Sequence, residues 1–356
     1  MRVVVDVSPL SHQRTGVGNY IRGSLLGMSE AAAAGDEVVA FAPASPRGRR
    51  AIEAALDGIA VERRLPALPA AHLFRTTWSR VGRPPAERFL GHFDVLHFSD
   101  WMVPPQRHGL RSTMVHDLVP LHHPEWVRTR TAALHGAKLR HLHGCDLVFT
   151  NSRFTADDVA DTLGLPRERL RVAHPGVGPP FAPDGDHAHL GRPYALTVAT
   201  LEPRKNLGTL LEAYRLLDPD ELALAVVGGA GWGEQPRLDL PGVIGLGYTA
   251  NDELPRLYRG AVVFVYPSRF EGFGMPVLEA MACGVPCVVS AHPSLDEVCG
   301  DAAVRVDPDD AEAIADGIRG ALAGRDALVE RGLARAAGFT WRENGRIHLE
   351  AFREAA

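Results

Sequence analysis

The chain has 356 residues, a net charge of −5 and 46% hydrophobic residues. This length predicts two domains with sizeable cores, and the ordinary composition argues against disorder, collagen or coiled coil as the main architecture. Residues 1–190 hold 22 Lys and Arg against 19 Asp and Glu, and residues 191–356 hold 16 against 24. Neither half has the basic excess that is typical of nucleic-acid-binding proteins, so we expect no nucleic-acid partner.

Short β-rich runs alternate with helical patterns along the whole chain, which predicts parallel sheets with helices on both faces. Eleven strands are predicted, at residues 2–7, 37–41, 94–98, 112–116, 146–150, 194–200, 222–227, 243–246, 262–266, 286–290 and 303–306. Helices are predicted, for example, at residues 207–217 and 311–323.

Residues 175–193 contain five Pro and four Gly, which indicates a boundary between domains. We expect an N-terminal domain over residues 1–190, with this Pro/Gly-rich linker at its end. A C-terminal domain is expected over residues 191–340.

No apolar run approaches the roughly 18 residues that span a bilayer, and Asp6 comes too early for a secretory signal. A cytoplasmic location is therefore expected. Four cysteines are too few for a disulfide framework, and the spacing of Cys283 and Cys287 is not that of the usual zinc sites. Free buried thiols and no metal site are predicted.

The informative polar residues follow predicted strands, because ligands of open parallel sheets lie beyond the carboxyl ends of the strands. Residues 268–280 read S-R-F-E-G-F-G-M-P-V-L-E-A. Gly272 and Gly274 allow close backbone approach, and Pro276 suits the first turn of a helix whose start would bind an anion. Glu271 and Glu279 are expected in one pocket, where carboxylates accept hydroxyl hydrogen bonds from a sugar or ribose diol. The alternative is a tight turn with solvated acids.

A second loop, E-P-R-K-N at residues 202–206, follows another predicted strand. Arg204 and Lys205 would stand at the start of a helix capped by Asn206, which suits a diphosphate. A solvated basic turn is the alternative.

Two loops of the first half are weaker candidates. Gly16 and Gly18 predict either a flexible glycine loop over a phosphate or acceptor, or a plain loop; the next glycine is Gly23, so the dinucleotide spacing fails and NAD is disfavoured. His116 could bind a sugar hydroxyl and Asp117 could orient an acceptor, although lone histidines are more often structural.

Residues 63–92 hold six Arg and a single acid, interleaved with large hydrophobic side chains. A solvated face is the default interpretation of such a stretch. Peripheral contact with the anionic inner surface of the cytoplasmic membrane is the alternative.

The loop from Glu271 to Glu279, E-G-F-G-M-P-V-L-E, resembles the E-x7-E motif of the retaining glycosyltransferases of family 4. The resemblance extends to E-P-R-K-N, to T-G-V-G-N-Y at residues 15–20 and to H-D at residues 116–117. It implies the GT-B fold: α/β, with two Rossmann-like doubly wound domains facing across a cleft. It also implies that the domain of residues 1–190 binds the acceptor, that the domain of residues 191–340 binds the nucleotide sugar, and that residues 341–356 form a terminal helix that crosses back to the first domain.

Roles for single residues come from the same resemblance. Glu279 would hold the ribose, Glu271 the donor sugar hydroxyls, and Arg204 with Lys205 the diphosphate. His116 would contact the donor sugar. The other donor-binding positions implied are Gly16, Gly18, Phe273, Gly274, Met275 and Asp117.

The implied activity is transfer of a hexose, with retention and without a metal, from a nucleotide-diphosphate sugar to a hydroxyl. The subgroup that the motifs resemble is mannosyltransferase-like, so GDP-mannose is the favoured donor and a UDP-sugar the second. The acceptor would be a glycan, a glycolipid or a small molecule. Two alternatives stay open: a sugar-nucleotide-binding subunit without turnover, and a two-carboxylate glycoside hydrolase, in which Arg204 and Lys205 would have no role.

Overall fold

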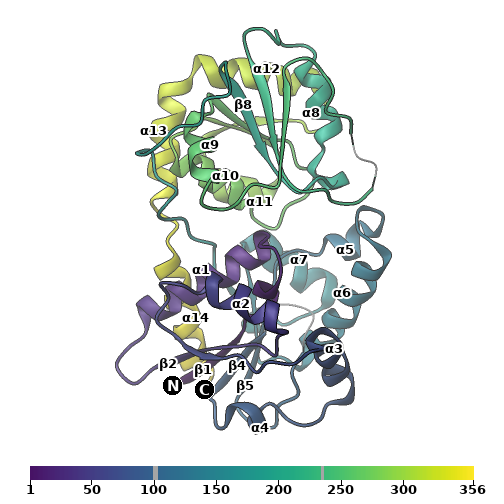
Figure 1. The fold of residues 1–356 in the computed structure, drawn as a ribbon, viewed down its shortest axis with the longest axis vertical. Coiled ribbons are helices and arrows are strands. Elements are labelled where there is room, and N and C mark those ends of the chain that lie inside the picture. Colours follow the sequence, from purple (N-terminus) through teal and green to yellow (C-terminus); the bar gives the residue numbers. More distant parts are fainter. Residues whose placement is uncertain (99–102, 234–235) are drawn as a thin grey trace. The chain divides into compact units, whose positions relative to one another are not determined.

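The computed structural model describes residues 1–98, 103–233 and 236–356, which form two compact units (Figure 1). Unit 1 comprises Met1–Leu121, Arg130–Gly176 and Thr340–Ala356, and unit 2 comprises His122–Thr129 and Val177–Phe339. Each unit contains its own parallel sheet with helices on both faces. The predicted α/β class with two Rossmann-like domains is therefore confirmed.

The described residues of unit 1 form a seven-stranded sheet in the order β3-β2-β1-β4-β5-β6-β7. In β1 the residues Val3, Val4 and Val5 form a continuous buried apolar run, because central parallel strands are covered on both faces. The strands are β1 (Arg2–Asp6), β2 (Glu37–Phe41), β3 (Glu62–Arg64), β4 (Val95–Phe98), β5 (Leu110–Val115), β6 (Leu147–Thr150) and β7 (Leu170–Val172). The helices are α1 (Gly16–Ala31), α2 (Pro46–Ala55), α3 (Ala71–Val81), α4 (Glu87–Leu90), α5 (Val119–His122), α6 (Thr129–His141), α7 (Arg153–Leu163) and α14 (Trp341–Ala355).

The last helix, α14, packs along α1, so the C-terminal end of the chain is part of unit 1 (Figure 1). Glycines make this close approach possible: a Cβ added to Gly27 would lie 1.7 Å from the backbone oxygen of Trp341. Asn344 on α14 donates to the hydroxyl of Tyr20 on α1 (3.1 Å) and to the carbonyl of Ala173 (3.1 Å).

Unit 2 carries, within its described residues, a six-stranded sheet in the order β10-β9-β8-β11-β12-β13. One core lies between this sheet and α9, α10 and α11, and a second lies between the sheet and α8 and α12. The strands are β8 (Tyr194–Val198), β9 (Ala223–Val227), β10 (Val243–Gly247), β11 (Val263–Tyr266), β12 (Cys287–Ser290) and β13 (Ala303–Val306). The helices are α8 (Leu207–Tyr214), α9 (Leu254–Gly260), α10 (Met275–Ala282), α11 (Pro293–Cys299), α12 (Ala311–Ala323) and α13 (Arg325–Ala336).

All eleven predicted strands are present, and the four cysteines are free and buried, as expected. The prediction of a glycine loop at Gly16 and Gly18 is wrong, because these residues form the first turn of α1. Tertiary packing accounts for the helix, because α1 lies against α14 and against the turn formed by Ser8–Ser11. None of the described helices has both the length and the hydropathy needed to cross a membrane.

Candidate functional site

Glu271 stands at the centre of a buried ionic network beyond the carboxyl ends of β8 and β11. Its two carboxylate oxygens accept from Lys205 Nζ (2.5 Å) and from the Arg204 guanidinium (3.2 Å). A second carboxylate, Glu202, pairs with Arg204 Nε (2.6 Å), and the side chains of Glu202 and Glu271 are only 4% and 7% exposed. Two cations therefore face two carboxylates with little water between them, where electrostatic interactions are strong.

The loops hold this network in place through their backbones. Pro203–Lys205 forms a 3-10 turn after β8, and Arg204 Nη1 donates to the carbonyl of Phe270 (3.0 Å). The Arg204 carbonyl in turn accepts from the Arg269 N–H (2.8 Å) and the Ser268 hydroxyl (3.1 Å). The loop after β8 and the loop after β11 thus form one hydrogen-bonded body, which positions the two cations against Glu271.

The network sets the ionisation of its members. Burial alone would raise the pKa of Glu271, but the Lys205 and Arg204 charges outweigh it and hold this pKa at about 2. Burial, and then the Arg204 charge, lower the pKa of Lys205 against the opposing attraction of Glu271. We conclude that Glu271 is an anion near neutral pH, and that burial opposes the charges of both Glu271 and Lys205 but lowers the pKa of Lys205 overall.

Tyr266, the last residue of β11, completes the surroundings of Lys205. Lys205 Nζ donates to its hydroxyl (2.6 Å) and lies 5.0 Å from its ring centroid. A cavity of about 10 Å³, roughly the volume that one water needs, adjoins Lys205 and is lined by residues of the β8 and β9 ends.

Glu279 occupies a separate environment on α10. Its carboxylate accepts from the Tyr258 hydroxyl of α9 (2.9 Å), and no ion pair is found for it among the described residues. Burial raises the pKa of Glu279 to about 7, against the smaller lowering effect of the Tyr258 hydrogen bond. The two carboxylates of the motif are therefore unlike: Glu271 is held ionised, and Glu279 titrates near neutral pH.

Gly274 sets the start of α10 with a φ of 105°, and a Cβ there would lie 2.6 Å from Leu295. Both facts require glycine at this position. The side chain of Phe273 is buried and stands edge-on to Phe339 (5.6 Å), so its contribution to a ligand site would come from its backbone. Met275 is partly buried against the same core.

The remaining predicted residues lie in unit 1. His116 follows β5, and its Nε2 is buried without a hydrogen-bond partner among the described residues. Burial, followed by the charge of Lys138, lowers the pKa of His116 to about 3, so this imidazole is neutral. Asp117 accepts from the N–H of Val119 (3.1 Å) and so caps the turn of α5. Gly16, at the start of α1, has open space where a Cβ would be.

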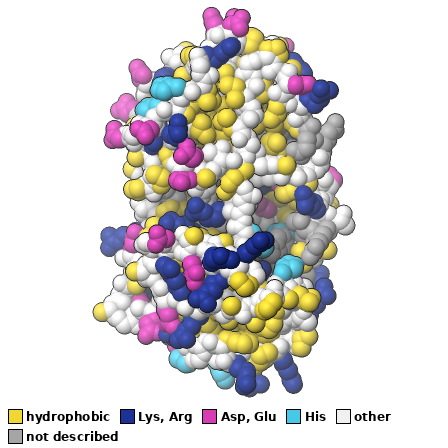
Figure 2. Space-filling view, viewed as in Figure 1, with side chains coloured by type: hydrophobic (Ala, Val, Ile, Leu, Met, Phe, Trp, Pro, Cys, Tyr) yellow, Lys and Arg dark blue, Asp and Glu magenta, His cyan; other side chains and the backbone are white. Residues whose placement is uncertain are grey.

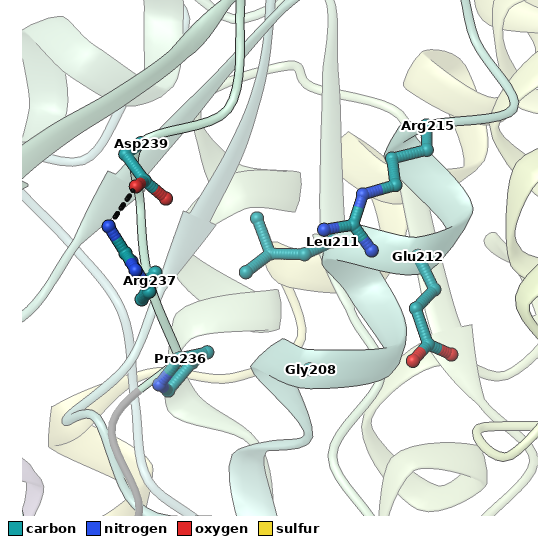
Figure 3. A pocket seen from close by; sticks show the side chains of 7 residues that line it. All are labelled: Gly208, Leu211, Glu212, Arg215, Pro236, Arg237 and Asp239. Carbon is teal, nitrogen blue, oxygen red and sulfur yellow. Dashed lines mark ion pairs between the residues drawn. The ribbon is translucent and has the colours of Figure 1, made fainter.

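A hollow of about 460 Å³ lies elsewhere in unit 2, between α8 and residues 236–239 (Figure 3). Leu211 points into it, Arg237 pairs with Asp239 on one side (2.7 Å), and Glu212 and Arg215 lie on the other. None of the residues of the ionic network lines this hollow, so we assign the chemistry to the network and not to the larger space.

Three residues of the site escaped the sequence analysis: Glu202, Tyr258 and Tyr266. Glu202 is the first residue of the E-P-R-K-N loop, which is a signal that could have indicated it. Tyr258 and Tyr266 are placed by tertiary packing alone. Asn206 stands at the predicted cap position with a φ of 57°, but its side chain caps no backbone N–H; it accepts from Thr209 and donates to the Pro308 carbonyl.

Comparisons with known proteins agree with this architecture. The family Glycosyl transferases group 1 matches residues 185–334, and Glycosyltransferase Family 4 matches residues 16–179. O-antigen chain mannosyltransferase B of Escherichia coli is 35% identical, over 67% of this chain and 68% of that protein. Serotype-specific mannosyltransferase WbdA of E. coli is 29% identical, over 74% of this chain and 36% of its own length.

Solved structures show the same fold at low identity. Sucrose-phosphate synthase from Thermosynechococcus elongatus has a TM-score of 0.73 at 18% identity, covering 99% of this chain and 98% of its own. Anabaena HepE, in complex with UDP and glucose, has a TM-score of 0.69 at 17% identity and 98% coverage of both chains. The chain therefore belongs to glycosyltransferase family 4, with the GT-B type of fold and with mannosyltransferases among its relatives.

Proposed function

We propose that this protein transfers a hexose, with retention, from a nucleotide-diphosphate sugar to a hydroxyl of a glycan, a glycolipid or a small molecule. The observation that carries the proposal is the placement of Arg204, Lys205 and Glu271 in one buried network beside the start of α10. Mannose is favoured because the two E. coli relatives above are named mannosyltransferases. GDP-mannose is the first donor to test and a UDP-sugar the second, since HepE binds UDP.

The proposed mechanism follows from charge. Breaking the anomeric bond builds negative charge on the departing diphosphate and positive charge on the sugar ring. Arg204, Lys205 and the N–H groups that begin α10 would stabilise the diphosphate, a role that needs no metal ion. The diphosphate would take over hydrogen bonds that Lys205 and Arg204 now give to Glu271, which frees this carboxylate for the sugar hydroxyls.

Retention would follow if the departing phosphate accepts the proton of the acceptor hydroxyl on the face that it leaves. We therefore assign no general base to the protein. His116 supports this assignment, because an imidazole with a pKa of about 3 is a poor base at neutral pH and a suitable hydrogen-bond partner for a sugar hydroxyl.

The proposal is tested by incubating the purified chain with radiolabelled GDP-mannose or UDP-glucose and a mannose-terminated oligosaccharide, with and without EDTA. We expect donor-dependent glycosylation, insensitivity to EDTA and, by NMR, an α-linked product from an α-linked donor. Cleavage of a nitrophenyl mannoside without nucleotide would instead indicate the glycoside hydrolase. Binding of the donor without transfer to any acceptor would indicate the subunit without turnover.

A cytoplasmic location with peripheral contact to an anionic membrane surface is part of the proposal. Large hydrophobic side chains gather over α3 and α4 with cations beside them (Figure 2). Leu73, Val81 and Phe89 are 67%, 63% and 40% exposed, and Arg80 and Arg88 are exposed on the same two helices. Sedimentation with phosphatidylglycerol vesicles, and not with phosphatidylcholine vesicles, is the expected result; equal recovery with both would contradict it.

A further inference from the structure

Residues His122–Thr129 belong to unit 2, although the chain segments directly before and after them belong to unit 1. Two hydrogen bonds from side chains to backbone carbonyls hold this segment beyond the carboxyl end of β9. Trp232 Nε1–H donates to the carbonyl of Trp126, and the Arg128 guanidinium donates to the carbonyl of Gly231 (3.2 Å). The Arg128 guanidinium also lies 5.8 Å from the ring centroid of Trp232.

The segment carries two stacked rings. His123 and Trp126 lie parallel, with centroids 3.8 Å apart and an interplanar angle of 12°. His123 also stands edge-on to Phe270, at 5.9 Å. Phe270 directly precedes Glu271, and its carbonyl accepts from Arg204. The ring pair is therefore anchored beside the loop that carries the ionic network.

The two rings are partly exposed, and they stack on each other in the absence of a ligand. The His123 side chain is 34% exposed, and Trp126 is half-buried. The Glu125 carboxylate lies 3.2 Å from His123 Nδ1, and the side chain of Glu125 is 62% exposed. Rigid, partly exposed aromatic faces attract the C–H face of a sugar ring through their negative π-surface. The negative charge of the carboxylate beside them repels a phosphate group.

We propose that the His123–Trp126 pair is an acceptor subsite that receives a neutral hexopyranose residue of the glycan to be extended. The inference rests on the proposed function, because it assumes that Glu271, Arg204 and Lys205 handle the donor. The expected acceptor is a neutral sugar whose ring stacks on the pair, and not a phosphorylated small molecule. Trp126 and His123 would act on binding of this acceptor and not on the donor.

The test compares Trp126→Ala, Trp126→Phe and His123→Ala with Glu125→Gln, which changes the same turn but leaves both rings. Three quantities are measured: the KM for a mannose-terminated oligosaccharide, the KM for the donor, and donor hydrolysis without acceptor. We expect Trp126→Ala to raise the acceptor KM at least about tenfold, with Trp126→Phe and Glu125→Gln within about threefold of the wild type. His123→Ala should also raise it, and it serves if Trp126→Ala fails to fold. The donor KM and donor hydrolysis should not change.

An unchanged acceptor KM in both ring variants would overturn the subsite, and so would a parallel rise of donor and acceptor KM. If the wild type neither transfers nor hydrolyses any nucleotide sugar, the proposed function fails. The subsite is then decided separately by saturation-transfer NMR with the oligosaccharide alone. Signals from the ring protons of the sugar that disappear in Trp126→Ala support the subsite, and signals that persist, or are absent from the wild type, overturn it.

Discussion

The ammonium group of Lys205 donates hydrogen bonds to a carboxylate and to a phenol, with Nζ 2.5 Å from Glu271 Oε1 and 2.6 Å from the Tyr266 hydroxyl. Its side chain is 10% exposed. A cation in such a position interacts strongly with any anion that reaches it, because little water competes. The same position makes it costly to remove, since Glu271 would then depend on Arg204 alone.

We expect Lys205→Ala and Arg204→Ala each to lower turnover at least tenfold, and more nearly by a factor of about a hundred, because each removes a donor to the developing diphosphate charge. Lys205→Arg should rescue poorly, since the planar guanidinium cannot replace a point charge between two acceptors. Initial rates and melting temperatures should be recorded together. Arg256→Ala, which removes an exposed ion pair on α9, is the matched control. Normal kinetics in both site variants would refute the phosphate assignment.

Glu279 gives the site a second testable property, because its pKa is raised to about 7 by burial. Below this pH the carboxyl is protonated and accepts fewer hydrogen bonds from a ribose diol. Donor affinity, measured by calorimetry, should therefore be about tenfold lower near pH 6 than near pH 8. A nucleotide sugar is the appropriate ligand, since its esterified diphosphate keeps its charge over this range.

In Glu279→Gln the affinity should be low and nearly independent of pH. Glu253→Gln, at an exposed position beside α9, should keep the wild-type profile. A wild-type affinity that does not change between the two pH values would contradict the assignment of Glu279 to the ribose.

At the scale of elements, the contact of α1 with α14 ties the end of the chain to its beginning. Gly27→Ala would place a methyl group 1.7 Å from the backbone oxygen of Trp341. Because this oxygen belongs to the backbone, no change of side-chain rotamer can relieve the clash. We expect a loss of about 3 kcal/mol or more in the free energy of unfolding, measured with urea. Gly320→Ala on α12 is the control, because nothing lies within 4 Å of a Cβ at this position. Its free energy of unfolding should rise by about 0.5–1 kcal/mol. Equal stability of the two variants would mean that the helices are not in contact.

The sequence predicts those elements well whose own residues determine them. The eleven β-rich runs became strands because a buried parallel strand must be apolar on both faces. The strands β3 and β7, which have three residues each, were not predicted from the sequence. β3 reads Glu-Arg-Arg, without apolar residues, and lies at the edge of the sheet. The loops that hold Arg204, Lys205 and Glu271, and the start of the helix α10 that carries Glu279, could be predicted because they follow strands. Their partners Tyr258 and Tyr266, and the attachment of residues 122–129 to unit 2, depend on contacts between distant parts of the chain.

At the scale of the whole molecule, the two units have unlike buried chemistry. The buried carboxylate of Glu271 in unit 2 is held ionised by two cations, whereas unit 1 buries neutral histidines around β4, β5 and α14. His348 on α14 stacks on Phe149 of β6 (4.1 Å, 16°) and contacts the His97 ring edge-on (5.5 Å). Burial lowers the pKa of both imidazoles, that of His348 to about 4. Unit 1 should therefore be the part of the molecule that is sensitive to acid.

A histidine whose pKa is lower in the folded state than in the unfolded chain stabilises the fold above about pH 6.5, and this stabilisation is lost as pH falls toward the folded-state pKa. For His348, the loss between pH 7 and pH 5 is about 2 kcal/mol. Burial raises the pKa of Asp6 to about 6 and that of Glu279 to about 7, so these two carboxyl groups act in the opposite direction over this range. His116 and His135 add to the effect of His348. We expect the melting temperature to fall over this interval.

His348→Phe keeps the stacked ring without its titration, so its unfolding free energy should fall by about 2 kcal/mol less than that of the wild type between pH 7 and pH 5. Urea unfolding at both pH values measures this change in the free energy of unfolding for each protein. An equal change in the wild type and in His348→Phe would show that His348 is not buried as a neutral ring.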